Sequence, residues 1–153
     1  MAGMIGRVPL HLGLGRFMEP TTRWLHARGR GVTRADAVTA GSALARRVEA
    51  WFGDADIVVS PTVGKLAPRI GSFGNLDGEG VFRAAAPLGA FTAPFNVSGQ
   101  PAISLPLASA HGVPIGVQLV ADMGREDLLL RVAAQLEEAV PWAERRPPTF
   151  AAA

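Results

Sequence analysis

Residues 91–106 read FTAPFNVSGQPAISLP, and this stretch decides the fold because it joins a helix to a strand through a preset turn. A short helix is predicted within residues 87–97, and Gly99 closes it because glycine tolerates the left-handed cap conformation. Gly99 and Pro101 together impose a tight turn after that helix. The side chain of Asn96 can hydrogen-bond to the backbone of this turn. Asn96, Gly99 and Pro101 are therefore predicted to be structural turn residues.

The segments around this turn predict strands. Ala102–Pro106 directly follows it, and Pro114–Val120 comes next, with the turn residues His111 and Gly112 between them. Two such runs across a short turn indicate a hairpin or two adjacent strands. Upstream, Asp56–Pro61 is rich in β-branched residues and ends in proline, which is typical of a buried strand that leads into a loop.

Two longer helices are predicted on either side of these strands. Thr33 and Asp36 form a capping-box pattern that opens the first helix, and Gly53 is expected to end it. The second helix covers Arg125–Ala139 and stops before Pro141. Each has apolar residues at three- and four-residue steps, which indicates a single buried face. These residues are Val38, Gly41, Leu44, Ala45, Val48, Trp51 and Phe52 in the first helix, and Leu129, Val132, Leu136 and Val140 in the second.

The rest of the chain is less regular. Residues 1–32 hold frequent glycine and proline and are expected to form an irregular lead-in with one short helix at Pro20–Ala27. Residues 62–80 are predicted to form a long loop, a feature that is often functional in compact domains. At 153 residues the chain is long enough for one domain and too short for two. Residues 33–150 are expected to form its core.

Composition excludes several classes of function. The net charge is only +2, with 14 arginines and the single lysine Lys65 scattered along the chain, so a nucleic-acid partner is not expected. There is no cysteine, which excludes disulfides and thiol catalysis. No apolar run approaches the roughly 20 residues that span a bilayer, and the N-terminus lacks the pattern of a secretory signal. A cytoplasmic location without membrane association is therefore expected.

A search for catalytic motifs finds none. Gly71-Ser72-Phe73-Gly74 has the wrong spacing for the nucleophile turn Gly-x-Ser-x-Gly. The three histidines are isolated from one another, with no His-Glu-x-x-His pair that could hold a metal, and each is expected in a loop or at the surface; they are His11, His26 and His111. From the residues alone, we predict no catalytic group, no metal site and no cofactor.

Three blocks in order nevertheless carry a resemblance: residues 91–106, residues 112–120 (GVPIGVQLV) and residues 124–130 (GREDLLL). Together they closely resemble the C-terminal signature of amidase signature enzymes. Residues 18–23 and 56–62 also look like segments of that family, so the resemblance spans nearly the whole chain. It implies an α/β fold, a partial α/β/α sandwich around a mixed β-sheet, in which residues 1–153 form the C-terminal part of the amidase signature domain.

The resemblance also implies a chemistry. Members of the family hydrolyse carboxamide C–N bonds with a nucleophilic serine, a bridging serine in a cis peptide and a lysine, and without a metal. These three residues precede the part matched by this chain, which has no comparable Gly/Ser-rich segment. Because the matched segment passes near the family's substrate pocket, Phe91, Thr92 and Phe95 are candidate pocket-wall residues, with simple packing as the alternative. Glutamine-using subunits of the family tend to carry an acidic residue where this chain has Gly89-Ala90, so glutamine is not the expected substrate.

Three functional hypotheses remain open at this point. The chain could be the C-terminal part of an amidase that takes its triad from a separately encoded N-terminal segment, and would then act on an amide small molecule only when complemented. It could instead be a non-catalytic remnant with a structural or self-associating role. A small-molecule binding module is the third hypothesis. In each case strand edges and apolar faces are expected to be exposed, which favours association.

Overall fold

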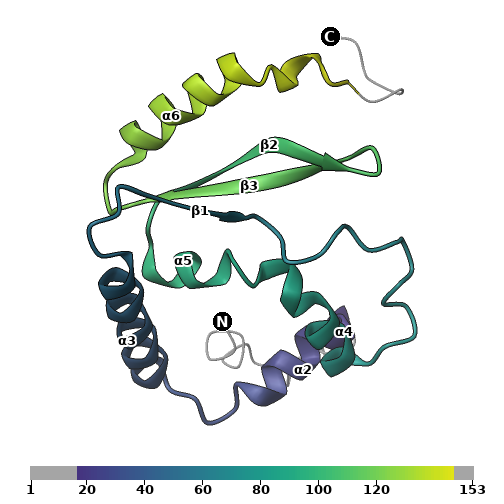
Figure 1. Cartoon of the computed structure of the whole chain (residues 1–153). Helices are drawn as coiled ribbons and strands as arrows, with labels where there is room; N and C mark the ends of the chain where they lie inside the picture. Colours follow the sequence, from purple (N-terminus) through teal and green to yellow (C-terminus); the bar gives the residue numbers. More distant parts are fainter. Residues whose placement is uncertain (1–16, 147–153) are drawn as a thin grey trace.

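The computed structural model describes residues 17–146, which form two layers of helices around a small β-sheet (Figure 1). Helix α6 covers one face of the sheet, and α3 and α5 lie on the other. This arrangement confirms the predicted α/β sandwich. In chain order the elements are α2 (Pro20–Arg28), α3 (Arg34–Phe52), β1 (Ile57–Pro61), α4 (Gly78–Ala85), η3 (Ala86–Gly89), α5 (Ala93–Ser98), β2 (Ala102–Ala110), β3 (Val113–Ala121), α6 (Glu126–Ala139) and η4 (Trp142–Glu144).

The sheet has the strand order β1-β3-β2, and both pairings are antiparallel. The predicted hairpin is confirmed: His111 and Gly112 form a two-residue loop between β2 and β3, with φ angles of 53° and 77°. Positive φ at both central residues matches the twist of the flanking strands. A mixed sheet was expected, but the pairings within residues 17–146 are all antiparallel. For β2 and β3 the reason is local, because a two-residue turn joins antiparallel neighbours.

One apolar cluster lies between the sheet and α6. Leu119 and Ala121 of β3 and Leu105 of β2 project toward Leu129 and Ala133 of α6, and all five are buried. Successive strand residues alternate between faces, so Val120 points the other way and packs with the second cluster. The sheet therefore has buried residues on both of its faces.

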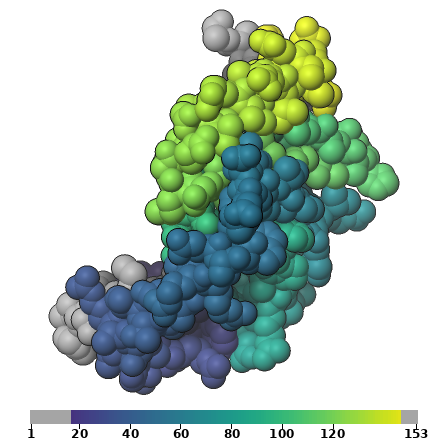
Figure 2. Space-filling model, turned by 60° about the vertical axis from the view of Figure 1, so that its left-hand side comes forward, coloured from purple at the N-terminus to yellow at the C-terminus, as the bar shows by residue number. Residues whose placement is uncertain are grey.

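The second cluster is smaller and lies between the sheet, α3 and α5. Val48 and Phe52 of α3 meet Phe95 of α5 and Val120 of β3. The predicted stripe of α3 is thus buried only in its second half. Residues 34–40 are all exposed, because the first half of the helix extends beyond the sheet into a lower lobe (Figure 2). Val38 and Trp51, both expected in the buried stripe, are exposed.

The helix starts and stops follow local chemistry. The predicted capping box is present: the Asp36 amide donates to the Thr33 hydroxyl at 3.1 Å, and the Thr33 amide donates to the Asp36 carboxylate at 2.9 Å. Gly53 ends α3 as predicted. The short helix predicted at residues 20–27 is also confirmed, as α2.

Two predictions about the middle of the chain were wrong in part. The loop predicted to reach Gly80 ends earlier, because Asp77 accepts a hydrogen bond from the Gly80 amide at 2.7 Å and so starts α4. The single helix predicted within residues 87–97 is split into η3 and α5. Pro87 and Pro94 each stand in the first turn of one of these pieces, where a missing N–H is tolerated, and so each begins a separate helix.

Candidate functional site

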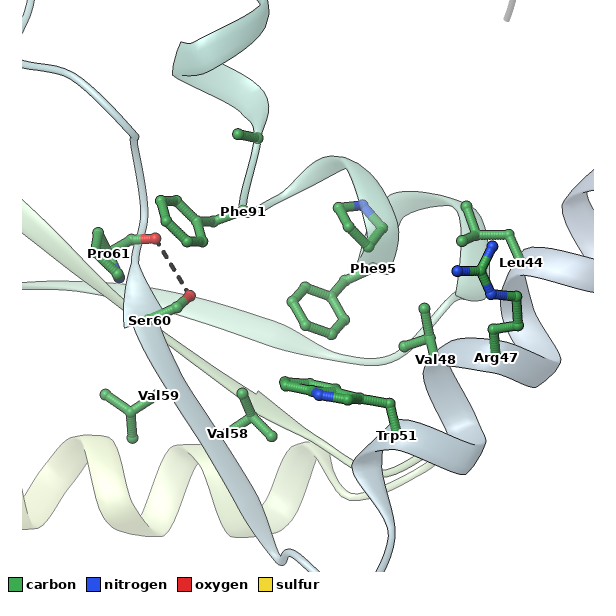
Figure 3. A pocket seen from close by; sticks show the side chains of 12 residues that line it. Leu44, Arg47, Val48, Trp51, Val58, Val59, Ser60, Pro61, Phe91 and Phe95 are labelled. Atoms are coloured by element: carbon green, nitrogen blue, oxygen red, sulfur yellow. Dashed lines mark hydrogen bonds between the residues drawn. The ribbon is translucent and has the colours of Figure 1, made fainter.

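An open cavity of about 600 Å³ lies on the α3 and α5 side of the sheet (Figure 3). One wall is the second half of α3, the floor is β1, and the other wall is the segment before and within α5. Apart from Arg47 and Ser60, the side chains that line it are apolar. The lining residues are Leu44, Arg47, Val48, Trp51, Val58, Val59, Ser60, Pro61, Ala90, Phe91, Pro94 and Phe95.

Two of the three predicted pocket-wall residues line this cavity. The rings of Phe91 and Phe95 both face the space in Figure 3, with Phe95 buried and Phe91 40% exposed. Thr92 lies between them in sequence but does not line the cavity. Its hydroxyl donates to the backbone carbonyl of Gly89 at 3.3 Å, which ties it into the turn that precedes α5.

Gln118 holds the cavity wall in place, and the sequence analysis missed it. It belongs to β3, is only 4% exposed, and its amide nitrogen donates to the Phe91 carbonyl at 3.1 Å and to the Ser60 hydroxyl at 3.2 Å. The Ser60 hydroxyl in turn donates to the Pro61 carbonyl at 3.2 Å. One buried amide therefore joins β3, β1 and the segment that carries Phe91. An amide within the otherwise apolar run of β3 was the available signal.

The turn residues lie just beyond the cavity. Gly99 has a φ of 91°, the left-handed cap conformation that ends α5, and its amide donates to the Phe95 carbonyl at 2.8 Å. The Pro101 carbonyl accepts from the Ala121 amide at 3.1 Å, which fastens the turn to β3. Asn96 behaves differently from the expectation: its side chain is exposed and makes no hydrogen bond among residues 17–146. The side-chain bond at this turn runs from the Ser98 hydroxyl to Gln100.

The hydroxyl groups near the sheet are paired with groups that cannot act as a base. Thr62 and Ser104 bond to each other through their hydroxyls at 2.6 Å, and the Ser72 hydroxyl donates to the Arg69 carbonyl at 2.7 Å. A nucleophilic hydroxyl needs an adjacent base to accept its proton. Thr33 does bond to a carboxylate, that of Asp36, but as part of an exposed helix cap. These contacts give none of the named hydroxyls an activating partner.

Among the described residues, Lys65, His26 and His111 do not line the first cavity. Lys65 is exposed in the loop after β1, where it lines a second, smaller cavity of about 480 Å³. His26 is buried in α2, although a loop or surface position was expected, and His111 is in the hairpin turn. His11 lies outside the described residues. Within residues 17–146, His, Asp and Glu nowhere form a group of three that could ligate a metal. No helix in the same range is long and apolar enough to cross a bilayer.

A family model described as Amidase matches residues 14–130, which include β1, the cavity wall and the whole sheet. The chain belongs to the amidase signature family. It is 48% identical to the 6-aminohexanoate-cyclic-dimer hydrolase of Pseudomonas sp. (strain NK87), in an alignment that covers 76% of this chain and 27% of that protein. It is 35% identical to the fatty acid amide hydrolase of Medicago truncatula, over 90% of this chain and 23% of that protein.

The fold agrees with this assignment. The solved structure of a 6-aminohexanoate cyclic dimer hydrolase superimposes with a TM-score of 0.79 and 39% identity, over 96% of this chain and 34% of that one. A bacterial aryl acylamidase of the amidase signature family, at 18% identity, shares the fold with a TM-score of 0.70. The chain thus spans about a quarter of the length of these curated relatives and about a third of the solved one.

Proposed function

We propose that this chain is the C-terminal part of an amidase signature hydrolase, that it contributes one wall of the amide pocket, and that the catalytic triad comes from another part of the enzyme. The observation that carries the proposal is the open apolar cavity lined by Phe91 and Phe95, in a chain that spans only 27% of a relative 48% identical to it. An apolar wall with few polar groups is typical of a small-molecule site.

The roles of the residues follow from their chemistry. In amide hydrolysis the C–N bond breaks, the oxygen of water joins the acyl carbon, and the amine leaves with a proton. Phe91 and Phe95 would pack against the apolar part of the substrate and exclude water from it, while Gln118 keeps the Phe91 segment in position through the Phe91 carbonyl. The nucleophile would come from outside this wall, since Ser60, Thr62 and Ser104 are bonded to groups that do not activate them.

The substrate class is an uncharged amide with an apolar acyl portion. The cavity lining supports this, because Arg47 is its one charged residue. The relatives named for 6-aminohexanoate cyclic dimer and for fatty acid amides make these two compound classes the first to test. A cytoplasmic location is part of the same proposal, and cell fractionation followed by immunoblotting would test it.

The first experiment measures amide hydrolysis by the purified chain of 153 residues. Ammonia release from primary amides, and new amine from the cyclic dimer, should both stay at the background rate. Turnover by the chain alone that a single Ser→Ala change abolishes would reveal a nucleophile in this chain and overturn the proposal.

The second experiment supplies the missing part of the enzyme. The chain is co-expressed with the N-terminal segment of the 6-aminohexanoate-cyclic-dimer hydrolase of Paenarthrobacter ureafaciens, which is also 48% identical, cut where the alignment with this chain begins. Turnover should appear, and Phe91→Ala should raise KM more than it lowers kcat. Val97→Ala is the matched control, because Val97 is exposed in the same segment but does not line the cavity. A complex that forms but has no activity would favour the alternative of a non-catalytic structural remnant.

A further inference from the structure

A second cavity of about 480 Å³ lies between the loop after β1, η3 and the start of β3. Its volume falls within the roughly 300–1,000 Å³ that small-molecule sites occupy. Its lining comes from residues 63–68, Leu88 and residues 113–115, and all of the side chains except that of Lys65 are apolar. None of the described residues lines both this cavity and the first one.

The two cavities adjoin where the loop after β1 meets η3. The Gly64 amide donates to the Pro87 carbonyl at 3.0 Å, and a Cβ atom at residue 64 would collide with this carbonyl oxygen. Glycine is suited to such a close approach of two backbone segments. Pro61 and Phe91 line the first cavity, whereas Gly64 and Leu88, a few residues away in the same two segments, line the second. The second cavity is therefore a distinct space beside the proposed amide pocket.

The lining of the second cavity leaves apolar side chains open to water. Leu66 is 51% exposed and Val113 is 48% exposed, and both border the cavity. Leu88 and Ile115 are half-buried in the same lining. Covering these side chains with an apolar group is favourable in proportion to the apolar area removed from water. The lining thus suits the hydrocarbon part of a small ligand.

The one charged side chain in the lining is a hydrogen-bond donor. Lys65 forms no ion pair among the described residues, and the backbone amides of Lys65, Leu66 and Ala67 make no hydrogen bond within that part of the chain. No Asp or Glu lines the cavity, and residues 57–76 contain neither, although they include Lys65 and Arg69. A lysine ammonium donates and cannot accept, so a carboxylate, which only accepts, is the group that pairs with it strongly.

We propose that the second cavity binds a carboxylic acid with an apolar chain, in its carboxylate form. The chain of the acid covers Leu66 and Val113, and its carboxylate pairs with Lys65. The source of the acid rests on the proposed function, because hydrolysis of an uncharged amide turns its acyl portion into a carboxylate. Charge then distinguishes the two cavities: the first takes the neutral amide, and the second takes the released acid.

Titration of the isotope-labelled chain with octanoate, followed by NMR, tests the proposal. The amide signals of Lys65, Leu66 and Ile115 should shift and saturate. Octanamide has a similar shape without the charge and should bind about fivefold more weakly, the size expected of a partly exposed charge pair. Equal binding of octanoate and octanamide would overturn the proposal. Inorganic phosphate that binds as tightly as octanoate would also overturn it, since this would indicate an anion site that has no apolar part.

Substitution of the lysine separates charge from packing. Lys65→Met keeps much of the aliphatic stem and should reduce octanoate affinity about fivefold while leaving octanamide affinity unchanged. Lys65→Arg should retain octanoate binding. Arg69→Met is the matched control, because Arg69 is exposed in the same loop but does not line the cavity, and it should bind octanoate as the wild-type chain does. Circular dichroism checks that the variants fold, and the comparison of octanoate with octanamide needs no variant.

The first cavity also contains a cation, that of Arg47, and supplies the competing location for the acid. Arg47→Met should leave octanoate affinity unchanged. A loss of affinity in Arg47→Met and not in Lys65→Met, with shifts at Trp51 and Phe95, would place the acid in the first cavity and overturn the proposal.

Two acids of different length distinguish the possible sources. Hexanoate has the length of an acid released from a small amide, and dodecanoate, kept below its micelle concentration, has that of an acid released from a fatty acid amide. Tighter binding of dodecanoate would assign a long-chain acid, and equal affinities would assign a short one. Either result supports a carboxylate site, and binding of neither acid would overturn it.

The same titration in the co-expressed complex separates this proposal from the proposed function. Octanoate should bind the complex as it binds the chain alone, and loss of binding in an active complex would overturn the carboxylate site while leaving the proposed function standing. Octanoate binding that depends on Lys65, in a complex without amide hydrolysis, would contradict the proposed function and keep the site for an acid from another reaction.

Discussion

The two faces of the sheet differ in how far this chain completes them. On the α6 face, the hairpin β2-β3 and the helix that directly follows it bury Leu119, Ala121 and Leu129 in one cluster. On the α3 and α5 face, Val120 and Phe95 are buried, but Phe95 also lines an open cavity whose wall carries the exposed Trp51. Contiguous chain is therefore sufficient to cover the first face, whereas the second keeps an open apolar cavity among the described residues. Substitutions on the two faces should have very different effects.

The largest effect on stability is expected for a substitution on the α6 face of the sheet. Leu119→Ala should lower the free energy of unfolding by about 2–5 kcal/mol, because Leu119 is 3% exposed and its removal leaves a cavity against α6. Urea unfolding followed by circular dichroism measures this. Val59→Ala is a matched control, since Val59 is the register partner of Leu119 on β1 but is 64% exposed. It should cost less than about 0.5 kcal/mol. An equal loss of stability in both variants would mean that α6 does not bury this face of the sheet.

A smaller effect is expected at the residue that joins β3 to the cavity wall. Gln118→Leu should cost about 1–3 kcal/mol, because it leaves the Phe91 carbonyl and the Ser60 hydroxyl without their donor. Hydrogen exchange of residues 90–93 should become faster. The other buried glutamine, Gln100, accepts a local bond from Ser98, so Gln100→Leu should leave exchange in residues 90–93 unchanged. If both variants behave alike, Gln118 does not hold the Phe91 segment.

The stability of the first half of α3, which extends beyond the sheet, should depend on pH. Hydrogen bonds from the Thr33 side chain, then from its backbone, hold the pKa of Asp36 below the usual aspartate range. The carboxylate is therefore favoured in the folded chain, and its stabilisation is complete above that range and is lost as pH falls through the lowered pKa. The wild-type chain should be more stable than the Asp36→Asn variant at neutral pH, and this difference should disappear in acid. Thr33→Ala removes the same bonds, so a pH dependence unlike that of Asp36→Asn would contradict the cap.

The smallest effect on the isolated chain is expected at the open cavity. Trp51→Ala should change the free energy of unfolding by less than about 0.5 kcal/mol, because most of the indole is already in water. In the complex with the N-terminal segment, the same change should raise KM, because Trp51 lines the proposed substrate cavity. Urea unfolding of the chain and steady-state kinetics of the complex measure the two effects. A cost close to that of Leu119→Ala would show that Trp51 belongs to a closed core.

Much of the fold could be predicted from sequence, because its signals are local. Thr33 and Asp36 cap a helix, Gly99 ends another, and the pair His111-Gly112 turns a hairpin through contacts within a few residues. The α4 helix was missed because Asp77 was interpreted as a loop residue when its side chain is an N-cap. The exposure of Val38 and Trp51 was also missed, since an apolar stripe indicates which face is suited to burial but not what covers it.

The candidate site was less predictable for a related reason. Phe91 and Phe95 were named from the resemblance, whereas α3 reaches the same cavity, and Gln118 reaches the Phe91 carbonyl, only through the tertiary fold. Thr92 was included with its neighbours, although its hydroxyl bonds to Gly89 and it lies off the cavity. Trp51, Phe91 and Gln118 are far apart in the sequence. Their contacts with one cavity wall depend on how the strands and helices pack, which local sequence patterns do not specify.

The most direct test is the release of new amine from 6-aminohexanoate cyclic dimer, measured for the chain alone and for the chain co-expressed with the N-terminal segment of the Paenarthrobacter ureafaciens hydrolase. We expect no turnover by the chain alone and clear turnover by the complex, reduced by Phe91→Ala and unaffected by Val97→Ala. Turnover by the chain alone, at a rate that the added segment does not change, would contradict the proposal that this chain supplies a pocket wall and not the chemistry.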